Sequence, residues 1–162
     1  MYFNSLRSIY ITMIKILFVC AGNTCRSVMA EYISKNIVTE LGLMNKFDIR
    51  SCGICVNNTQ TASFNTIEVI KIFNQDVSKH NAQSITKKLI QDSNYICAMD
   101  QLVLLYLREQ HGLKVSNNIF CISKEGINDP YGMSVKYYEI CRDNIKACLE
   151  IIIPKIIKYE KL

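Results

Sequence analysis

The feature that most limits how this chain can fold is an apolar run at residues 14–19 (IKILFV), followed at once by a glycine-containing turn and a helical pattern. The run has the length of a strand and is almost continuously apolar, as a strand covered on both faces of its sheet requires. Such strands belong to parallel sheets that carry helices on either side. We therefore expect an α/β protein.

The rest of the chain continues this alternation of short β-branched runs with longer stretches of helical periodicity. Strands separated by helices form βαβ units, whose strands pair in parallel. We predict a single-domain α/β fold, a four-stranded parallel sheet with helices on both faces. The predicted strands span residues 14–19, 47–52, 94–99 and 119–122; the predicted helices span 27–41, 84–89 and 101–111, and two more start at 63 and 134.

The periodicity and the ends of the helices predict three further details. The short helix at 84–89 is expected to be capped by Ser84, and the last helix to end or kink at Pro154. The buried stripe of the first helix is predicted as Ala30, Ile33, Ile37 and Leu41, and that of the last as Tyr138, Cys141, Ile145, Cys148 and Ile152.

Composition and charge exclude several classes of protein. Of the 162 residues, 49% are hydrophobic and 20% charged, which is typical of a globular domain. The excess of 19 basic over 14 acidic residues favours anionic ligands, but no basic stripe with interleaved aromatic residues indicates a nucleic-acid partner. No apolar run reaches the ~18 residues of a membrane helix, and no cleavage site follows residues 9–19. We expect a cytoplasmic protein with no membrane partner.

Eight cysteines would suggest a disulfide framework in a small secreted chain. Here most lie inside apolar periodic segments, as Cys97 and Cys121 do, which favours buried free thiols in a reducing compartment. The Cys52-x-x-Cys55 pair has no second pair downstream, and the chain has only 2 histidines. We interpret this pair as packing at a strand end, and expect neither a metal nor a cofactor.

Residues 1–12 fit none of this pattern, and Met13 stands directly before the first predicted strand. We expect a disordered extension over 1–12, or an upstream start codon, and a folded domain over 13–162. A chain that starts at Met13 should then keep the fold and its activity.

The candidate site lies where the first strand leads into its helix, because ligands of open parallel sheets bind beyond the carboxyl ends of the strands. Residues 20–27 (CAGNTCRS) stand there, with Cys20 and Arg26 separated by five residues. Small residues let backbone N–H groups converge on one anion at a helix N-terminus, and the Arg26 fork suits two phosphoryl oxygens. The same surroundings are expected to lower the pKa of Cys20 from ~8.5, giving a nucleophilic thiolate at neutral pH.

This loop and three other motifs resemble those of the low-molecular-weight protein tyrosine phosphatase family. The similar segments are residues 19–27 with Met29-Ala30-Glu31, Ser51-Cys52-Gly53 after the second strand, Ala98-Met99-Asp100 after the third, and Asp129-Pro130-Tyr131-Gly132 before the last helix. The resemblance covers about residues 13–160. It implies a flavodoxin-like fold and a phosphatase that needs no cofactor, acting on phosphorylated protein side chains through a phosphocysteine.

The resemblance also implies the catalytic roles. Cys20 would be the nucleophile, Arg26 the clamp on the phosphoryl group, and Asp129 the acid that protonates the leaving group and then activates water. A phosphorylated protein would be the substrate, and inorganic phosphate would be the product and a competitive ligand.

Around these residues, the resemblance assigns Ala21, Gly22, Asn23, Thr24, Cys25 and Ser27 to the phosphate-binding loop. Asn23 would hold the strained shape of the loop, since Asn tolerates a left-handed backbone, and Ser27 would hydrogen-bond to the Cys20 thiolate. His80 is implied to support Asn23, and Tyr131 to line the pocket. Cys25 lies close enough in sequence to capture an oxidised Cys20 as a disulfide.

Two substrate classes remain open, phosphotyrosine and phosphoarginine. Thr24 occupies the position where the family's phosphotyrosine enzymes mostly carry Ile and its bacterial protein-arginine-phosphatase branch carries Thr. A single aromatic residue, Tyr131, precedes Gly132, which is also similar to that branch. The segment 56–62 lacks the Trp or Tyr that often lines the phosphotyrosine pocket.

Two other functions are alternatives to phosphatase activity. Thioredoxin-coupled arsenate reduction, in a related family, usually needs a close cysteine pair after the third strand, whereas Cys97 is followed by no cysteine until Cys121. A silent phosphoprotein-binding module would be indicated by loss of Cys20, Arg26 or Asp129, and all three are present.

Overall fold

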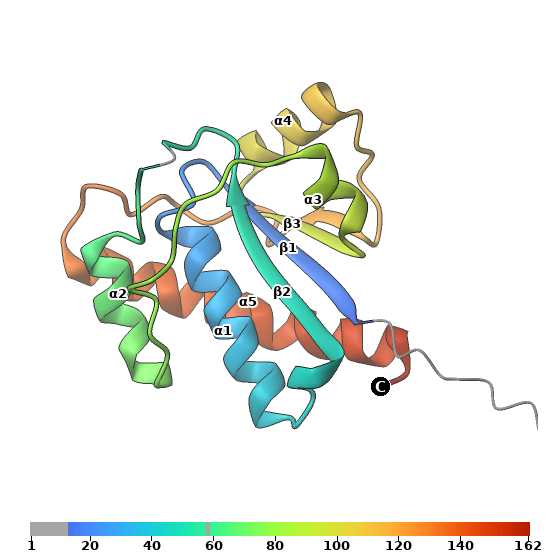
Figure 1. Ribbon diagram of the computed structural model, residues 1–162, viewed down its shortest axis with the longest axis horizontal. Helices are drawn as coiled ribbons and strands as arrows, with labels where there is room; N and C mark the ends of the chain where they lie inside the picture. Colours follow the sequence, from blue (N-terminus) through green and yellow to red (C-terminus); the bar gives the residue numbers. More distant parts are fainter. Residues whose placement is uncertain (1–12, 58) are drawn as a thin grey trace, which may run out of the picture.

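In the computed structural model, which describes residues 13–57 and 59–162, four parallel strands form one sheet in the order β2-β1-β3-β4 (Figure 1). The strands are β1 (Ile14–Cys20), β2 (Phe47–Gly53), β3 (Tyr95–Ala98) and β4 (Ile119–Cys121); the helices are α1 (Arg26–Glu40), α2 (Phe64–Ile70), α3 (Lys87–Asp92), α4 (Gln101–His111) and α5 (Val135–Glu160), with 3-10 turns η1 (Met44–Lys46) and η2 (Lys71–Phe73). The predicted α/β fold is confirmed. The expectation for residues 1–12 lies outside the described residues.

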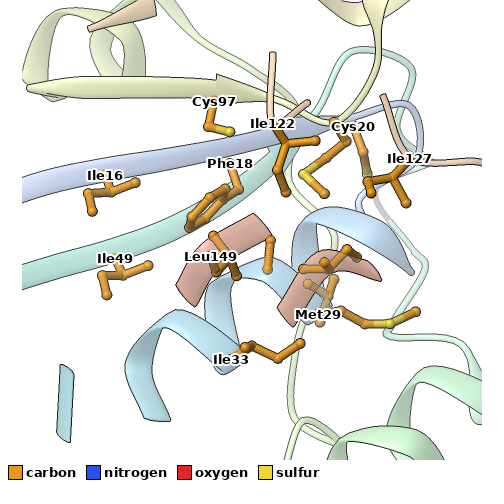
Figure 2. Close-up of a cluster of buried hydrophobic side chains, with 14 of the residues drawn as sticks. Ile16, Phe18, Cys20, Met29, Ile33, Ile49, Cys97, Ile122, Ile127 and Leu149 are labelled. Carbon is orange, nitrogen blue, oxygen red and sulfur yellow. The ribbon is translucent and has the colours of Figure 1, made fainter. Parts of the chain in front are cut away.

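β1 shows why the sheet is covered on both faces. Phe18 points to one face, where it packs in a cluster with Met29 of α1 and Leu149 of α5 (Figure 2). Its neighbour Leu17 points to the other face and packs in a cluster with Leu107 of α4, because successive side chains of a strand alternate. Each of these five side chains is almost completely buried, which stabilises the fold by roughly 1.5–3 kcal/mol per side chain. The apolar run in the sequence thus places β1 at the centre of two cores.

The cap of α3 differs from the prediction. Thr86, not Ser84, caps this helix, its hydroxyl oxygen accepting a hydrogen bond of 3.1 Å from the Leu89 N–H. Ser84 is instead bridged in parallel to Gly53, and the Ile85 N–H donates to the Gly53 carbonyl at 2.8 Å. Residues 84 and 85 therefore extend the pairing at the end of β2, and the helix starts two residues later.

The buried stripe of α5 follows the true helical period. The buried side chains are Tyr138, Cys141, Ile145, Leu149, Ile153 and Ile156. The predicted Cys148 and Ile152 are only partly buried, because a strict seven-residue repeat drifts by ~20° per heptad around a straight helix. Of the two alternatives predicted for Pro154, an end of the helix is wrong, since α5 continues to Glu160, and a kink stays a prediction. Pro154 and Glu150, the residue whose carbonyl loses its partner, are both exposed, so water can satisfy that carbonyl.

The stripe of α1 is confirmed in its first half and wrong in its second. Ala30 and Ile33 are buried, but Val38 is buried where Ile37 was expected. Leu41 is 54% exposed because it lies beyond the last residue of the helix.

The eight cysteines all lie within the described residues, and all are free thiols. Cys52 is buried at the end of β2, as the packing interpretation requires, but Cys55 is exposed because β2 ends at Gly53. Among the described residues, no group of three His, Cys, Asp or Glu side chains could hold a metal ion. No helix in the same part of the chain is long and apolar enough to cross a membrane.

Candidate active site

The loop between β1 and α1 is held from outside by the segment that follows β2. The carbonyls of Cys20, Ala21 and Thr24 accept hydrogen bonds from the N–H groups of Ile54, Cys55 and Ser63, at 3.0, 2.9 and 3.0 Å respectively. Because these carbonyls are bonded to the outer segment, the loop can direct N–H groups to a ligand on its other side.

A cavity of about 240 Å³ opens at this loop. It is lined by Cys20, Ala21, Gly22, Thr24, Cys25, Arg26, Cys55, Gln60, Asp129 and Tyr131. The structure therefore brings the expected nucleophile, cation and acid to one space, although Asp129 is more than 100 residues from the loop. Asn23, Ser27 and His80 lie behind the loop, buried below the lining.

Asn23 fixes the backbone shape of the loop. It is fully buried and left-handed, with φ of 54°, a conformation that costs a residue with a Cβ roughly 1–2 kcal/mol. Its side-chain N–H groups donate to Ser27 Oγ at 3.0 Å and Ser51 Oγ at 2.9 Å, and its Oδ1 accepts from the Gln83 N–H at 2.9 Å. His80 Nε2 lies 3.0 Å from the Asn23 carbonyl oxygen. These bonds offset the strain.

The network behind Asn23 ends on a carboxylate that the sequence had not identified as a site residue. The Ser51 hydroxyl donates to Glu31 Oε2 at 2.6 Å, and the other carboxylate oxygen of Glu31 pairs with Lys35. In the sequence, Glu31 stands out only as part of the segment Met29-Ala30-Glu31, which resembles the family motif. Glu31 lies on the buried side of α1. Helical periodicity alone does not identify such a residue, because it assigns charged side chains to the solvent-exposed face of a helix.

Cys20 is 3% exposed. Ser27 Oγ lies 2.9 Å from its sulfur, and the Asn23 N–H donates to the sulfur at 3.2 Å. Burial raises the pKa of the Cys20 thiol above its ordinary value, and this outweighs the opposing effects of Ser27, Arg26 and Asn23. The expected lowering of this pKa is therefore wrong.

The positive charge of Arg26 lowers the pKa of Cys20, but this effect does not outweigh that of burial. The guanidinium is shared between two carboxylates, Asp100 on one nitrogen and Asp129 at 2.7 Å on the other. It also donates to the Ile127 carbonyl at 3.0 Å. A cation paired with two anions presents little net charge to a neighbouring thiol. The sequence identifies Asp100 only as part of a motif after the third strand. It does not predict the ion pair with Arg26, which the structure shows.

Asp129 and Tyr131 lie on the loop before α5. The Tyr131 N–H donates to Asp129 Oδ1 at 3.1 Å, while Asp129 Oδ2 bonds to Arg26. This pair of contacts aims the carboxylate at the cavity. Tyr131 is 63% exposed and is, among the residues that the structure describes, the only aromatic one that lines the cavity.

The remaining cysteines fall into two groups. Cys25 is a buried residue of the loop that lines the cavity, its sulfur 3.4 Å from the Tyr138 hydroxyl and 3.5 Å from Ser63 Oγ. Cys97 is fully buried inside β3, and Cys121 lies on β4 opposite Ala98. Neither Cys97 nor Cys121 lines the cavity, so neither is placed to relay a disulfide from Cys20.

Comparison with known proteins agrees with this geometry. The family model described as low molecular weight phosphotyrosine protein phosphatase matches residues 15–161. The chain belongs to this family. Its members are cysteine-dependent phosphatases, and the matched residues include the whole cavity and its supporting network.

Individual relatives differ in what they act on. A protein-arginine-phosphatase of Bacillus subtilis is 28% identical, over 83% of this chain and 91% of that protein. An arsenate reductase of Staphylococcus aureus (strain Newman) is 30% identical, over 83% of this chain and 92% of that protein. The crystal structure of a low molecular weight protein tyrosine phosphatase from T. tengcongensis matches with a TM-score of 0.81 at 29% identity, covering 88% of this chain and 99% of that one.

The close approach at Gly53 yields a first prediction. A Cβ there would lie 2.5 Å from the Ala21 carbonyl oxygen and 3.0 Å from the Asn23 nitrogen, both backbone atoms of the loop. Gly53→Ala should therefore displace the loop and lower kcat for p-nitrophenyl phosphate by about a hundredfold, the scale of a misplacement near 1 Å. Gly42→Ala is the control: nothing lies within 4 Å of its Cβ, so the strain at its φ of 70° should lower stability but leave kcat unchanged. Equal kcat values for the two variants would contradict the prediction.

A second prediction concerns the charge balance around Arg26. Asp129→Asn removes one anion from the guanidinium, so more positive charge acts on Cys20 and its pKa should fall. The rate of Cys20 alkylation by iodoacetamide, followed by mass spectrometry of the peptide, should then rise at a lower pH than in the wild type. Cys20→Ser gives the background. An unchanged profile, or one moved to higher pH, would show that Asp129 does not restrain the thiol.

Proposed function

We propose that the protein hydrolyses phosphorylated side chains of proteins, phosphotyrosine in the first place, through a phosphocysteine on Cys20. The observation that carries the proposal is that Cys20, Arg26 and Asp129 line one cavity, although they come from three segments of the chain. A nucleophile, a bidentate cation and an acid are the groups that phosphoryl transfer through a covalent intermediate needs.

In the first step, the loop N–H groups and Arg26 bind the phosphoryl oxygens. The Cys20 thiolate attacks phosphorus, an S–P bond forms, and the bond from phosphorus to the leaving oxygen breaks. Asp129 gives its proton to that oxygen. Because a protonated Asp129 no longer neutralises Arg26, the acid form of Asp129 and the thiolate form of Cys20 favour each other.

In the second step, Asp129 takes a proton from a water molecule, which attacks the phosphocysteine. The S–P bond breaks, inorganic phosphate leaves, and the Cys20 thiolate is restored. Ser27, 2.9 Å from the sulfur, can donate a hydrogen bond to the departing thiolate and so makes it a better leaving group. Free phosphate, which fits the same cradle, should inhibit competitively.

Phosphoarginine is the second candidate substrate. Thr24 lines the cavity, where it offers a hydroxyl instead of a hydrocarbon wall, and Tyr131 supplies one aromatic side chain. The Bacillus subtilis relative named a protein-arginine-phosphatase supports the same candidate. Arsenate reduction has less support, despite the Staphylococcus aureus relative, because neither Cys97 nor Cys121 lines the cavity. The free thiols support a reducing compartment, and we place the enzyme in the cytoplasm.

Substitution of the acid tests the mechanism. Asp129→Asn should lower kcat by ~10²–10⁴-fold on a phosphotyrosine peptide, whose leaving group needs a proton. It should lower kcat much less on p-nitrophenyl phosphate, whose leaving anion is stable. Cys20→Ser should be inactive on both. Equal losses for Asp129→Asn on the two substrates would mean that Asp129 is not the proton donor.

Substitution of Thr24 tests the choice of substrate. Burying guanidinium N–H groups against an apolar wall costs ~1–3 kcal/mol for each unsatisfied group. Thr24→Ile should therefore lower kcat/KM for a phosphoarginine peptide by roughly five- to hundredfold and raise it for a phosphotyrosine peptide. The two peptides are measured side by side. Parallel changes in both would rule out Thr24 as a determinant of specificity.

A further inference from the structure

The cavity has a polar wall that no part of the mechanism uses. It is formed by the segment after β2, which contributes Gln60 and Cys55 to the lining. We propose that Gln60 is a specificity-determining residue, whose side-chain oxygen accepts a hydrogen bond from the leaving group of phosphoarginine. This inference rests on the proposed phosphatase function and concerns its second candidate substrate, phosphoarginine.

The backbone of Gln60 is fixed on both sides. Its N–H donates to the Asn57 carbonyl at 3.0 Å, and its carbonyl accepts from the Ala82 N–H at 2.9 Å. The next residue, Thr61, forms an antiparallel bridge with Asn81. Residues 80–83 also hold Asn23 of the phosphate loop. The loop and the segment around Gln60 are therefore both anchored to residues 80–83. The side chain therefore starts from a defined position relative to the bound phosphoryl group.

The Gln60 amide is available for a ligand. The residue is partly buried, and its side chain makes no hydrogen bond with any residue that the structure describes, Asn58 not being among them. Thr24, the other polar candidate, is only 6% exposed, and its hydroxyl lies 3.5 Å from Cys25 Sγ. Of these two side chains, Gln60 reaches farther into solvent, where the part of the substrate beyond phosphorus must lie.

The two leaving groups are best bound by different kinds of side chain in the cavity wall. A guanidine group carries several N–H donors at its edge and needs acceptors, whereas a phenol ring carries no donor around its edge and gains most from apolar or aromatic contact. The cavity offers acceptors on Gln60 and Asp129, but only one aromatic ring, that of Tyr131. A site that bonds to a substrate N–H discriminates strongly against a substrate that lacks it, because its acceptor is then left unpaired.

The chemistry is otherwise that of the proposed mechanism. Cys20 forms the S–P bond while the P–N bond breaks, and the Asp129 proton passes to the departing guanidine nitrogen. Gln60 exchanges no proton with the substrate. It orients the guanidine group so that this nitrogen faces Asp129, and it accepts from a different N–H.

The test replaces the amide by a side chain of the same length. Gln60→Met, which cannot hydrogen-bond in the same way, should lower kcat/KM for a phosphoarginine peptide about tenfold, the loss of one hydrogen bond to a charged group. Its kcat/KM for a phosphotyrosine peptide should stay equal or rise. Gln60→Glu keeps an acceptor oxygen and should retain phosphoarginine hydrolysis. Gln110→Met, an exposed glutamine on α4 that does not line the cavity, is the matched control.

The outcomes separate this inference from the proposed function. If Gln60→Met lowers both peptide activities equally, or neither, Gln60 does not select the leaving group, while the phosphatase function stands. If the wild type hydrolyses phosphotyrosine but not phosphoarginine, the inference is also overturned and the proposed function remains. If the wild type hydrolyses neither peptide, nor p-nitrophenyl phosphate, both fail. A melting temperature within a few degrees of the wild type, compared across all variants, excludes unfolding as the cause.

Discussion

The site depends first on a positive charge that the fold carries into its interior. Arg26 is 4% exposed, and a buried charge is costly unless it is paired and hydrogen-bonded. Its partners come from separate segments: Asp100 follows β3, and Asp129 and the Ile127 carbonyl belong to the chain before α5. One guanidinium therefore ties three connections at the carboxyl end of the sheet into a single structure. The same pairing limits how far its charge reaches Cys20.

The second constraint is the shape of the loop, which is set before any ligand arrives. Asn23 is held in a left-handed conformation by side chains and backbone from α1, β2 and the segment at 80–83. Because these contacts hold the loop from behind, they fix the backbone that carries its N–H groups. Such preorganisation is what makes fixed dipoles more effective than water at stabilising a charged transition state. The buried Glu31 at the far end of the network shows how deep this support reaches into the domain.

Sequence reasoning located β1, the loop, Cys20 and Arg26 because each depends on contiguous residues. The apolar run fixes β1, and strand-loop-helix order places Cys20 and Arg26 at the ligand-binding edge. It located His80, Asp129 and Tyr131 only through resemblance. Sequence reasoning failed for features that depend on contacts between segments distant in the sequence. Ser84 has the chemistry of a cap, yet its backbone pairs with Gly53.

The same limit applies to the site. The pKa of Cys20 could not be predicted from the loop alone, because it is raised by burial of the thiol in the folded chain. In addition, Asp100 and Asp129, which share the Arg26 charge, are distant in sequence. Gln60 carries no motif, and only the folded chain shows that it lines the cavity. The stripe of α5 was missed for a different reason: a small error in the assumed period accumulates along a helix of 26 residues.

The segment after β2 serves the site with two different sets of atoms. Its backbone N–H groups at Ile54, Cys55 and Ser63 hold the loop carbonyls outward, and any residue except proline supplies such a group. Its side chains at Cys55 and Gln60 form the wall that the substrate meets. Substitutions in this segment can therefore alter which phosphorylated side chain is accepted while the hydrolytic machinery stays intact. In a protein with this arrangement, substrate specificity can change during evolution while every intermediate sequence keeps its hydrolytic activity.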